Sequence, residues 1–259
     1  EQGLLPMYGM PTRVRNLYLG MLTKGTGSEE ELSWLSMDRD LEMAIFEFAP
    51  GSLLVKDKEK HKSIGFTGSL LDPERRGRFI NVQPPVTNWI SEDGFVGWCV
   101  ACGAAKHERE RPGIGVQCDD CRGDILPGEF RHYVSPSSFR TDFRPEDGDI
   151  DDVGVMSTRT VATVAREGKP HDVGSIRIHA GAGTTIMQLN DGRPNELGEQ
   201  QLFEVEIMTD QEVATFPRGV QLPMQAIDTS VSIKDKNRRF QRTDDGIGQF
   251  GLFARKATE

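Results

Sequence analysis

The sequence predicts an α+β chain that is mostly β, with mixed short strands, one short helix and a zinc-ribbon-like insertion. Glycine occurs 28 times and proline 14 times in 259 residues, which indicates many turns and short strands rather than long helices. Residues 40–49 are the best match to helical spacing. Four cysteines fall in two close pairs between residues 99 and 121, a pattern typical of a zinc unit.

Three segments follow from this pattern. Residues 1–91 are expected to form an α+β segment, residues 92–134 a unit around the four cysteines, and residues 135–259 a β-rich segment continuous with the first. Residues 1–38 show no sustained period. The sequence therefore assigns no element there beyond a possible strand in which Arg13 and Arg15 alternate.

The helix is predicted over residues 40–49. Asp40 can cap its first turn, because a carboxylate accepts the free amide protons there. Apolar residues then recur at i, i+3, i+4 and i+7 on one face: Leu41, Ala44, Ile45 and Phe48. Pro50 and Gly51 follow and are expected to end the helix.

The strands are predicted from alternation and turn signals. Residues 53–55 form a strand, residues 56–60 a charged hairpin loop, and residues 63–71 the return strand, with Ile64 and Phe66 on one face. Further strands are predicted at 153–164, 175–180, 184–190 and 201–208.

Residues 141–152 are rich in aspartate and glutamate and are predicted to be a solvated acidic linker. Their centre resembles the start of a calcium loop at Asp147. The pattern then fails, because position six is Asp152 rather than glycine and position twelve is Thr158 rather than glutamate. The linker interpretation is therefore favoured.

Charge and hydropathy argue against several classes of protein: those that bind nucleic acid through their overall charge, those that span a membrane and those that are secreted. The net charge is −9, so any contact with nucleic acid must come from a local basic patch. No stretch approaches the ~20 apolar residues of a membrane span, and no membrane partner is expected. Residues 1–3 do not resemble a signal peptide, which favours a cytoplasmic protein. The first residue is Glu1 rather than Met, as expected for a piece of a longer protein.

No catalytic residues are predicted. Residues 24–28, KGTGS, have the wrong order for a phosphate-binding loop, and the motifs H-E-x-x-H and G-x-S-x-G do not occur. The chain therefore carries no ATP-dependent motor, and whether it has an enzymatic activity of its own stays open.

The four cysteines have the spacing C-x2-C-x15-C-x2-C: Cys99, Cys102, Cys118 and Cys121. This spacing matches a four-thiolate zinc site, and we expect one structural Zn²⁺ per chain, because four sulfurs leave no position for a reacting water. Gly103 and Gly123 follow the two pairs. They suit tight turns in which φ is positive and backbone N–H groups point at the thiolates.

Other interpretations of the cysteines are two disulfides or a redox C-x-x-C. Disulfides need an oxidising compartment, which nothing in the sequence indicates, and a redox motif needs no second pair. His107 lies nearby and could replace a cysteine as ligand, although a surface position is favoured because four cysteines already complete the site.

Local basic segments are the candidates for nucleic-acid contact. The best carries five cations and one aromatic ring within nine residues: Lys234, Lys236, Arg238, Arg239, Phe240 and Arg242. Cations contact phosphates and an aromatic ring can stack on a base, although a solvated basic loop has the same composition. A second basic cluster comprises Arg131, His132, Arg140 and Arg144.

Motifs along most of the chain match one family. Residues 40–52, DLEMAIFEFAPGS, resemble its D-x-A-[IL]-x-E-[FY]-A-P-G element; further matches lie at 3–15, 63–66, 139–142, 189–192, 202–203 and 254–259. With the cysteine quartet, they resemble the region C-terminal to the motor of bacterial superfamily 2 DNA helicases. The similarity is to mitomycin-repair helicases and most of all to the DISARM phage-defence helicases (DrmA-like).

This resemblance implies a non-catalytic zinc-binding accessory module of a DNA helicase. Its expected partners are the helicase motor domains, DNA held by the parent helicase, and a partner subunit of a defence system. DNA repair is the other process that the resemblance implies. The alternative is a protein-interaction scaffold with a purely structural zinc and no DNA contact, which the acidic balance favours.

Overall fold

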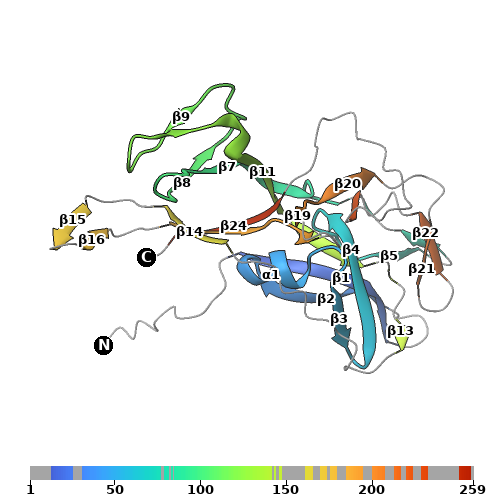
Figure 1. Ribbon diagram of the computed structural model, residues 1–259. Coiled ribbons are helices and arrows are strands. Elements are labelled where there is room, and N and C mark those ends of the chain that lie inside the picture. Colours follow the sequence, from blue (N-terminus) through green and yellow to red (C-terminus); the bar gives the residue numbers. More distant parts are fainter. Residues whose placement is uncertain are drawn as a thin grey trace, which may run out of the picture.

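The computed structural model describes residues 13–25, 31–76, 79–81, 83, 85–141, 143, 146–147, 161–165, 170–173, 176–179, 185–194, 200–207, 213–216, 220–223, 229–232 and 251–257. Two sheets, of eight and six strands, dominate this part of the chain (Figure 1). The one α-helix among the described residues is α1 (Leu41–Glu47). The mostly β, α+β fold predicted from the sequence is confirmed. No helix in the described residues is long and apolar enough to cross a membrane.

The eight-stranded sheet interleaves segments from before and after the cysteines. Its order is β2-β1-β12-β4-β23-β20, and β3 and β13 also pair with β4. The central strand β12 pairs parallel with β1 and antiparallel with β4. The strands are β1 (Val14–Lys24), β2 (Glu31–Asp40), β3 (Leu53–Lys56), β4 (Glu59–Thr67), β12 (Ser138–Thr141), β13 (Glu146–Asp147), β20 (Glu204–Ile207) and β23 (Thr229–Ser232).

The six-stranded sheet has the order β14-β17-β24-β11-β7-β8. Its strands are β7 (Ile90–Trp98), β8 (Ala105–Glu108), β11 (Phe130–Pro136), β14 (Val161–Ala165), β17 (Thr185–Asn190) and β24 (Gly251–Ala257). β7 and β11 pair antiparallel along their length. The cysteines lie between these two strands in the sequence, so the sheet holds both ends of the cysteine unit.

Five short strand pairs complete the described part. They are β5 (Glu74–Arg76) with β6 (Phe79–Asn81), β9 (Val116–Gln117) with β10 (Asp124–Ile125), β15 (Pro170–Val173) with β16 (Ile176–His179), β18 (Arg193–Pro194) with β19 (Gln200–Gln201), and β21 (Val213–Phe216) with β22 (Val220–Pro223). Of these, β9 and β10 belong to the cysteine unit, together with the 3-10 turn η2 (Pro127–Glu129).

The main core joins the two sheets through α1. Phe139 of β12 packs edge-on against Phe48 and Phe66, with ring centroids 5.7 and 5.4 Å away. Leu252 of β24 belongs to the same buried cluster. The Nδ2 of Asn190, at the end of β17, donates to the carbonyl of Ile45 in α1 at 2.6 Å. The helix therefore bridges the eight-stranded and six-stranded sheets.

The predicted helix is confirmed, with its cap. The Asp40 side chain accepts a hydrogen bond from the N–H of Glu42 at 3.2 Å, which satisfies one of the free donors of the first turn. The four residues of the predicted apolar face are buried: Leu41, Ala44, Ile45 and Phe48. The helix ends two residues earlier than predicted, at Glu47, and Gly51 follows with φ +90°.

The hairpin after the helix is confirmed, but its loop is shorter than predicted. β3 ends at Lys56 and β4 begins at Glu59, so the turn consists of Asp57 and Lys58 alone. The return strand ends at Thr67 rather than residue 71. Lys60 pairs with Val55 across the hairpin, which shows that residues assigned to the charged loop are ladder positions.

The longest hairpin of the described chain, β1–β2, was not predicted. Leu17, Tyr18 and Leu19 are all buried, so β1 is covered on both faces and shows no polar–apolar alternation. A β-bulge between Tyr18 and Gly20 also shifts the period by one residue. Residues 1–38 therefore look aperiodic in the sequence. Arg15 lies in a strand as expected, whereas Arg13 lies one residue before the strand begins.

The prediction of a solvated acidic linker over residues 141–152 is wrong for the residues of this segment that the structure describes. Thr141 ends β12 and is buried, and Phe143 is buried beneath Trp34 with ring centroids 6.0 Å apart. Residues 146 and 147 form β13 against β4. Of the later predictions, β16 and β17 match 175–180 and 184–190, β20 lies within 201–208, and β14 overlaps the end of 153–164.

Candidate metal centre

The cysteine unit extends from two paired strands of the six-stranded sheet. β7 ends at Trp98 and β11 begins at Phe130. The first cysteine pair lies in the turn between β7 and β8, and the second lies in the turn between β9 and β10. Both strand pairs are antiparallel. Each C-x2-C segment thus occupies a hairpin turn, hereafter the first and second knuckle.

The two knuckles share one hydrogen-bond pattern. In each, the N–H of the first cysteine donates to the carbonyl five residues later, and its own carbonyl accepts from the N–H four residues later. The four bonds are Cys99 N–H to Ala104 O (2.8 Å), Gly103 N–H to Cys99 O (2.7 Å), Cys118 N–H to Gly123 O (2.7 Å) and Arg122 N–H to Cys118 O (3.0 Å). The backbone therefore fixes each cysteine pair in the same local geometry.

The two knuckles bring the four sulfurs together. All four Sγ atoms lie within 4.8 Å of one another. Cys99 Sγ lies 3.4 Å from Cys121 Sγ, and Cys102 Sγ lies 3.5 Å from Cys118 Sγ. A tetrahedral zinc with Zn–S bonds of ~2.3 Å has sulfurs about 3.8 Å apart. The four cysteines could therefore hold one metal ion, and zinc fits their spacing and chemistry.

Each knuckle needs one left-handed residue, at the position four after its first cysteine. In the first knuckle this is Gly103, with φ +73°, as the sequence predicts. In the second it is Arg122, with φ +62°, and not Gly123. The expectation of a positive φ at Gly123 is therefore wrong.

Gly123 serves the site through close approach instead. Its N–H donates to Cys121 Sγ at 3.4 Å, as predicted for an amide pointing at a thiolate. A Cβ placed on Gly123 would lie 3.3 Å from that same sulfur. The missing side chain lets the backbone approach the sulfur, and an N–H donor stabilises the thiolate form.

The pKa values of Cys99, Cys102 and Cys121 are shifted in different directions. The N–H of Cys102, donated to the sulfur, lowers the pKa of Cys99 to about 7. The N–H of Ala104 acts to lower the pKa of Cys102, but burial and the neighbouring sulfurs outweigh it and raise that pKa to about 12. The N–H of Gly123 likewise lowers the pKa of Cys121, and the Cys99 sulfur reverses this, so that the net pKa is raised. The cluster therefore holds a first thiolate readily and resists others until a cation neutralises them.

A small apolar cluster supports the centre from the sheet side. Cys99 and Cys118 are buried together with Ile125 and Phe130. The Phe130 ring lies over Gly97, the residue opposite it in the β7–β11 ladder, where a Cβ would come within 2.9 Å of the ring. This aromatic–glycine pair connects the metal unit to the sheet, and sequence analysis missed it because it depends on register.

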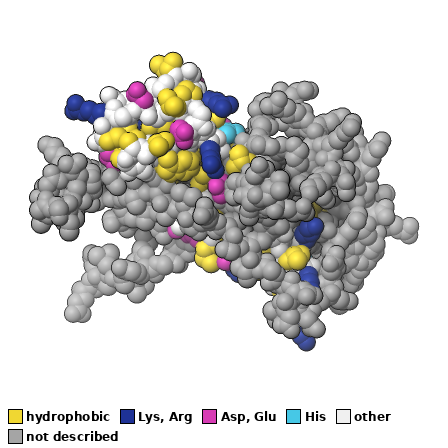
Figure 2. Space-filling view, in the orientation of Figure 1, with side chains coloured by type: hydrophobic (Ala, Val, Ile, Leu, Met, Phe, Trp, Pro, Cys, Tyr) yellow, Lys and Arg dark blue, Asp and Glu magenta, His cyan; other side chains and the backbone are white. Residues whose placement is uncertain are grey.

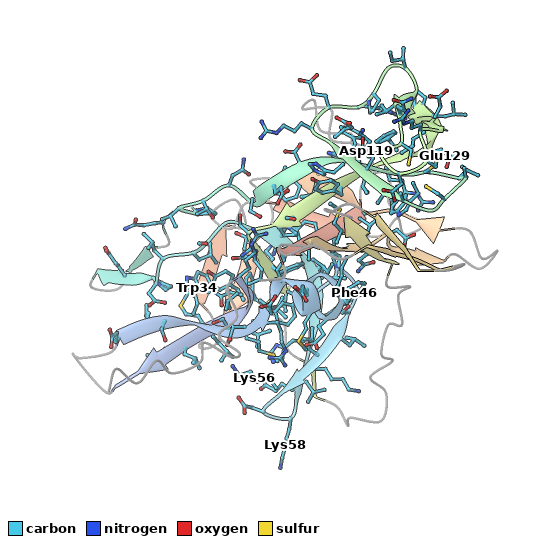
Figure 3. The ribbon with its side chains drawn as sticks, turned by 90° about the vertical axis from the view of Figure 1, so that its left-hand side faces the viewer. Trp34, Phe46, Lys56, Lys58, Asp119 and Glu129 are labelled. Atoms are coloured by element: carbon cyan, nitrogen blue, oxygen red, sulfur yellow. The ribbon has the colours of Figure 1, made fainter. Side chains whose placement is uncertain are left out.

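A lysine links the two knuckles from outside. Lys106 Nζ donates to the Asp119 carboxylate at 2.9 Å and to the carbonyl of Gln117 at 3.0 Å. Lys106 lies on β8, after the first knuckle, and Asp119 lies inside the second. Asp119 is well exposed, at 82%, so this ion pair contributes less than a buried one would. Figure 3 shows Asp119 in this unit, at the opposite end of the molecule from Lys58.

His107 is not a ligand in this structure. The group of metal-ligating side chains found in the described residues consists of the four cysteines. His107 lies opposite Val96 on β7, with Gly97 next to it on the other face. Its Nε2 is hydrogen-bonded to the Tyr133 hydroxyl. His107 was expected at the surface. It is instead half-buried, on the face of the sheet opposite to Phe130.

The second basic cluster does not form a common patch. Arg140 is fully buried, Arg131 is exposed and pairs with Asp191 at 3.1 Å, and His132 stacks on Phe95 with centroids 5.0 Å apart. These residues alternate between faces and strands, which a linear charge count cannot show. Arg144 and the segment with Lys234, Lys236, Arg238, Arg239, Phe240 and Arg242 lie outside the described residues.

No protein family, curated protein or solved structure matches the chain.

Proposed function

We propose that the chain is a non-catalytic accessory module of a superfamily 2 DNA helicase, built around one structural Zn²⁺. The observation that carries the metal assignment is the meeting of four sulfurs within 4.8 Å on two matching knuckles. A four-thiolate site leaves no open position for water or substrate. The metal would stabilise the unit between β7 and β11 rather than perform chemistry.

The unit is well placed to brace a larger assembly. β7 and β11 pair from Gly97–Phe130 to Ile90–Pro136, so the metal unit continues the six-stranded sheet. A fold dominated by sheet and one closed metal site suits a rigid positioning element. The helicase context itself rests on the motif resemblance, which extends over most of the chain. Free thiols at a metal site are kept in a reducing compartment, and we place the protein in the cytoplasm.

The helicase proposal is tested in the parent polypeptide that carries the motor. The variant C118S should lower DNA-stimulated ATP hydrolysis, because the brace loses its metal, and V100T, an exposed substitution in the first knuckle, should leave it unchanged. The chain alone should hydrolyse no ATP. Motor sequences absent from the parent gene, or equal stimulation in C118S and wild type, would refute the accessory role.

The DNA contact is proposed at residues 234–242, where five cations gather in an otherwise acidic chain. Replacing Arg238 and Arg239 by alanine should weaken binding and lower the salt slope by roughly two. Replacing Phe240 by alanine should weaken single strands more than duplex, since base stacking is worth ~1–3 kcal/mol. Unchanged binding of both variants across a salt series would leave the loop as a solvated face.

A protein-interaction scaffold is the second candidate. One observation favours it: three large apolar side chains of the metal unit are well exposed, Val100 at 82%, Ile114 at 80% and Leu126 at 59%. Figure 2 shows apolar surface mixed with acidic and basic side chains on this unit. A defence-system subunit would be a partner of this kind. Retained DNA binding after these three residues are made polar, with loss of partner binding, would separate the two roles.

A further inference from the structure

The β3–β4 hairpin carries an unusual concentration of lysine. Four lysines fall within residues 56–62, against Asp57 and Glu59. The whole chain has a net charge of −9, so this ribbon is a local reversal of sign. Among described residues, Lys58 and Lys62 are exposed, and Figure 3 shows Lys58 at the outermost end of the hairpin, pointing away from the body.

The lysines and the nearest carboxylate are divided between two faces. Lys60 and Lys62 lie opposite Val55 and Leu53 in the ladder, and residues two apart share a face. Glu59 lies on the other face, where its Oε2 is 4.0 Å from the Nε2 of buried His61. Glu59 therefore lies on the opposite face of the hairpin from Lys60 and Lys62.

Lys58, at the tip of the turn, has a left-handed backbone conformation that glycine adopts more easily than lysine. Asp57 and Lys58 have φ values of +53° and +69°, which is the pattern of a type I′ turn, where Asn-Gly and Asp-Gly are preferred. Lysine at the second position is therefore strained relative to glycine. Such strain is expected where a side chain has a use at that place.

The hairpin presents its lysines at a projecting end of the molecule. Its paired part and turn span ten residues, 53–62, β13 lies beside Glu59 and Lys60 of β4 as a third strand, and the hairpin projects from the lower edge of the molecule in Figure 1. Lysine side chains contact the phosphates of a duplex and position a protein on it without reading its sequence. We propose that the β3–β4 hairpin contacts the phosphate backbone of duplex nucleic acid through Lys58 and Lys62.

The acidic strand beside the ribbon supplies an opposing element. β13 pairs with β4, with Glu146 opposite Lys60 and Asp147 opposite Glu59. Two carboxylate residues thus stand at register positions next to the lysines. Their negative charge acts against the approach of phosphates, so neutralising them strengthens duplex binding. Removing these acidic charges and removing the lysine charges should therefore change duplex binding in opposite directions, which is not expected if the hairpin has only a structural role.

The test compares five versions of the full chain: the wild type, K58Q/K62Q, E146Q/D147N, R109Q/R111Q and R238A/R239A. Binding of a fluorescent 30-base-pair duplex is followed by anisotropy between about 50 and 200 mM salt. K58Q/K62Q should weaken binding about tenfold at low salt and lower the salt slope by about two, since each lost phosphate contact lowers it by ≈ 0.9. E146Q/D147N should strengthen binding. R109Q/R111Q is the matched control, because it removes two charges from exposed positions on the metal unit and should change the slope little.

The proposal rests on the DNA contact of the proposed function, and the outcomes separate the two. If wild type binds no duplex at low salt, both fail. If wild type binds and K58Q/K62Q matches R109Q/R111Q in affinity and slope, the hairpin proposal alone is overturned. In that case, weaker duplex binding by R238A/R239A would still support the contact proposed at residues 234–242. Unchanged metal content in K58Q/K62Q shows that lost binding is not caused by unfolding of the metal unit.

Discussion

One backbone position in each knuckle takes the left-handed conformation, and the two knuckles fill it differently. Gly103 does so without strain, whereas Arg122 pays the usual penalty of a side chain at φ +62°. In the second knuckle the glycine stands one residue later, where its amide reaches the sulfur of Cys121. The two glycines thus serve the same centre for different physical reasons.

Replacing either glycine with alanine should weaken metal binding. G103A places a Cβ at φ +73°, and G123A places one 3.3 Å from the Cys121 sulfur. A strain of about 1 kcal/mol corresponds to about fivefold in affinity.

Competition with a chelator of known zinc affinity measures this. G113A is the matched control, because a Cβ on Gly113 meets no atom within 4 Å, and it should bind zinc like wild type. Equal affinities in all three variants would mean that the knuckle backbone does not tune the site.

At the scale of elements, the β7–β11 ladder connects the metal unit to the body. Gly97 and Gly94 of β7 lie opposite Phe130 and Tyr133 of β11. The two rings fill the space over the two glycines on opposite faces of the sheet. Two glycine–aromatic pairs therefore fix the register of the ladder. One pair faces the metal centre, and the other faces the core that contains Val96 and Met187.

Substituting Gly97 should destabilise the protein and loosen the metal unit. In G97A the new Cβ would come within 2.9 Å of the Phe130 ring, which overpacks the pair at a cost of roughly 1–3 kcal/mol.

The control is G20A in β1, where a Cβ meets nothing within 4 Å and alanine removes backbone freedom from the unfolded chain. Urea unfolding should show a lower midpoint for G97A and no loss for G20A. Identical urea midpoints for the two variants would contradict the role of the Gly97–Phe130 pair in fixing the β7–β11 register.

Elements with a local signal could be predicted from the sequence. Asp40 and the apolar spacing of Leu41, Ala44, Ile45 and Phe48 mark a helix within ten residues, and the cysteine spacing marks the knuckles. β1 could not be predicted, because burial on both faces and a bulge at Leu19 erase its period. The parallel pairing of β12 with β1 and the position of Phe130 over Gly97 depend on contacts between distant segments, which no local pattern encodes.

At the scale of the molecule, the sheets and the metal unit have separate sources of stability. The sheet core contains Phe48, Phe66, Phe139 and other buried apolar residues. The metal unit has a small apolar cluster, with Ile125 and Phe130 as its largest buried members outside the cysteines. We therefore expect a unit with so little buried apolar surface to depend on a bound metal for folding.

Metal removal should therefore unfold one part of the chain. After chelation, amide hydrogen exchange should accelerate over residues 99–129, while β4 and β12 stay protected, because their core contains no cysteine.

The same experiment on V100T, with an exposed substitution in the first knuckle, should reproduce the wild-type pattern. Uniform acceleration across the eight-stranded sheet would show that the metal supports the whole molecule, and unchanged exchange in the unit would show that it supports nothing.

The central claim is that Cys99, Cys102, Cys118 and Cys121 hold one structural Zn²⁺. Native mass spectrometry of the purified chain, alone and after chelation, measures this directly. We predict one zinc per wild-type chain and none retained by C118S, with all four thiols of the wild type open to alkylation only after the metal is removed. A wild-type chain that carries no metal while its four thiols react freely, or that carries two disulfides, would contradict the account.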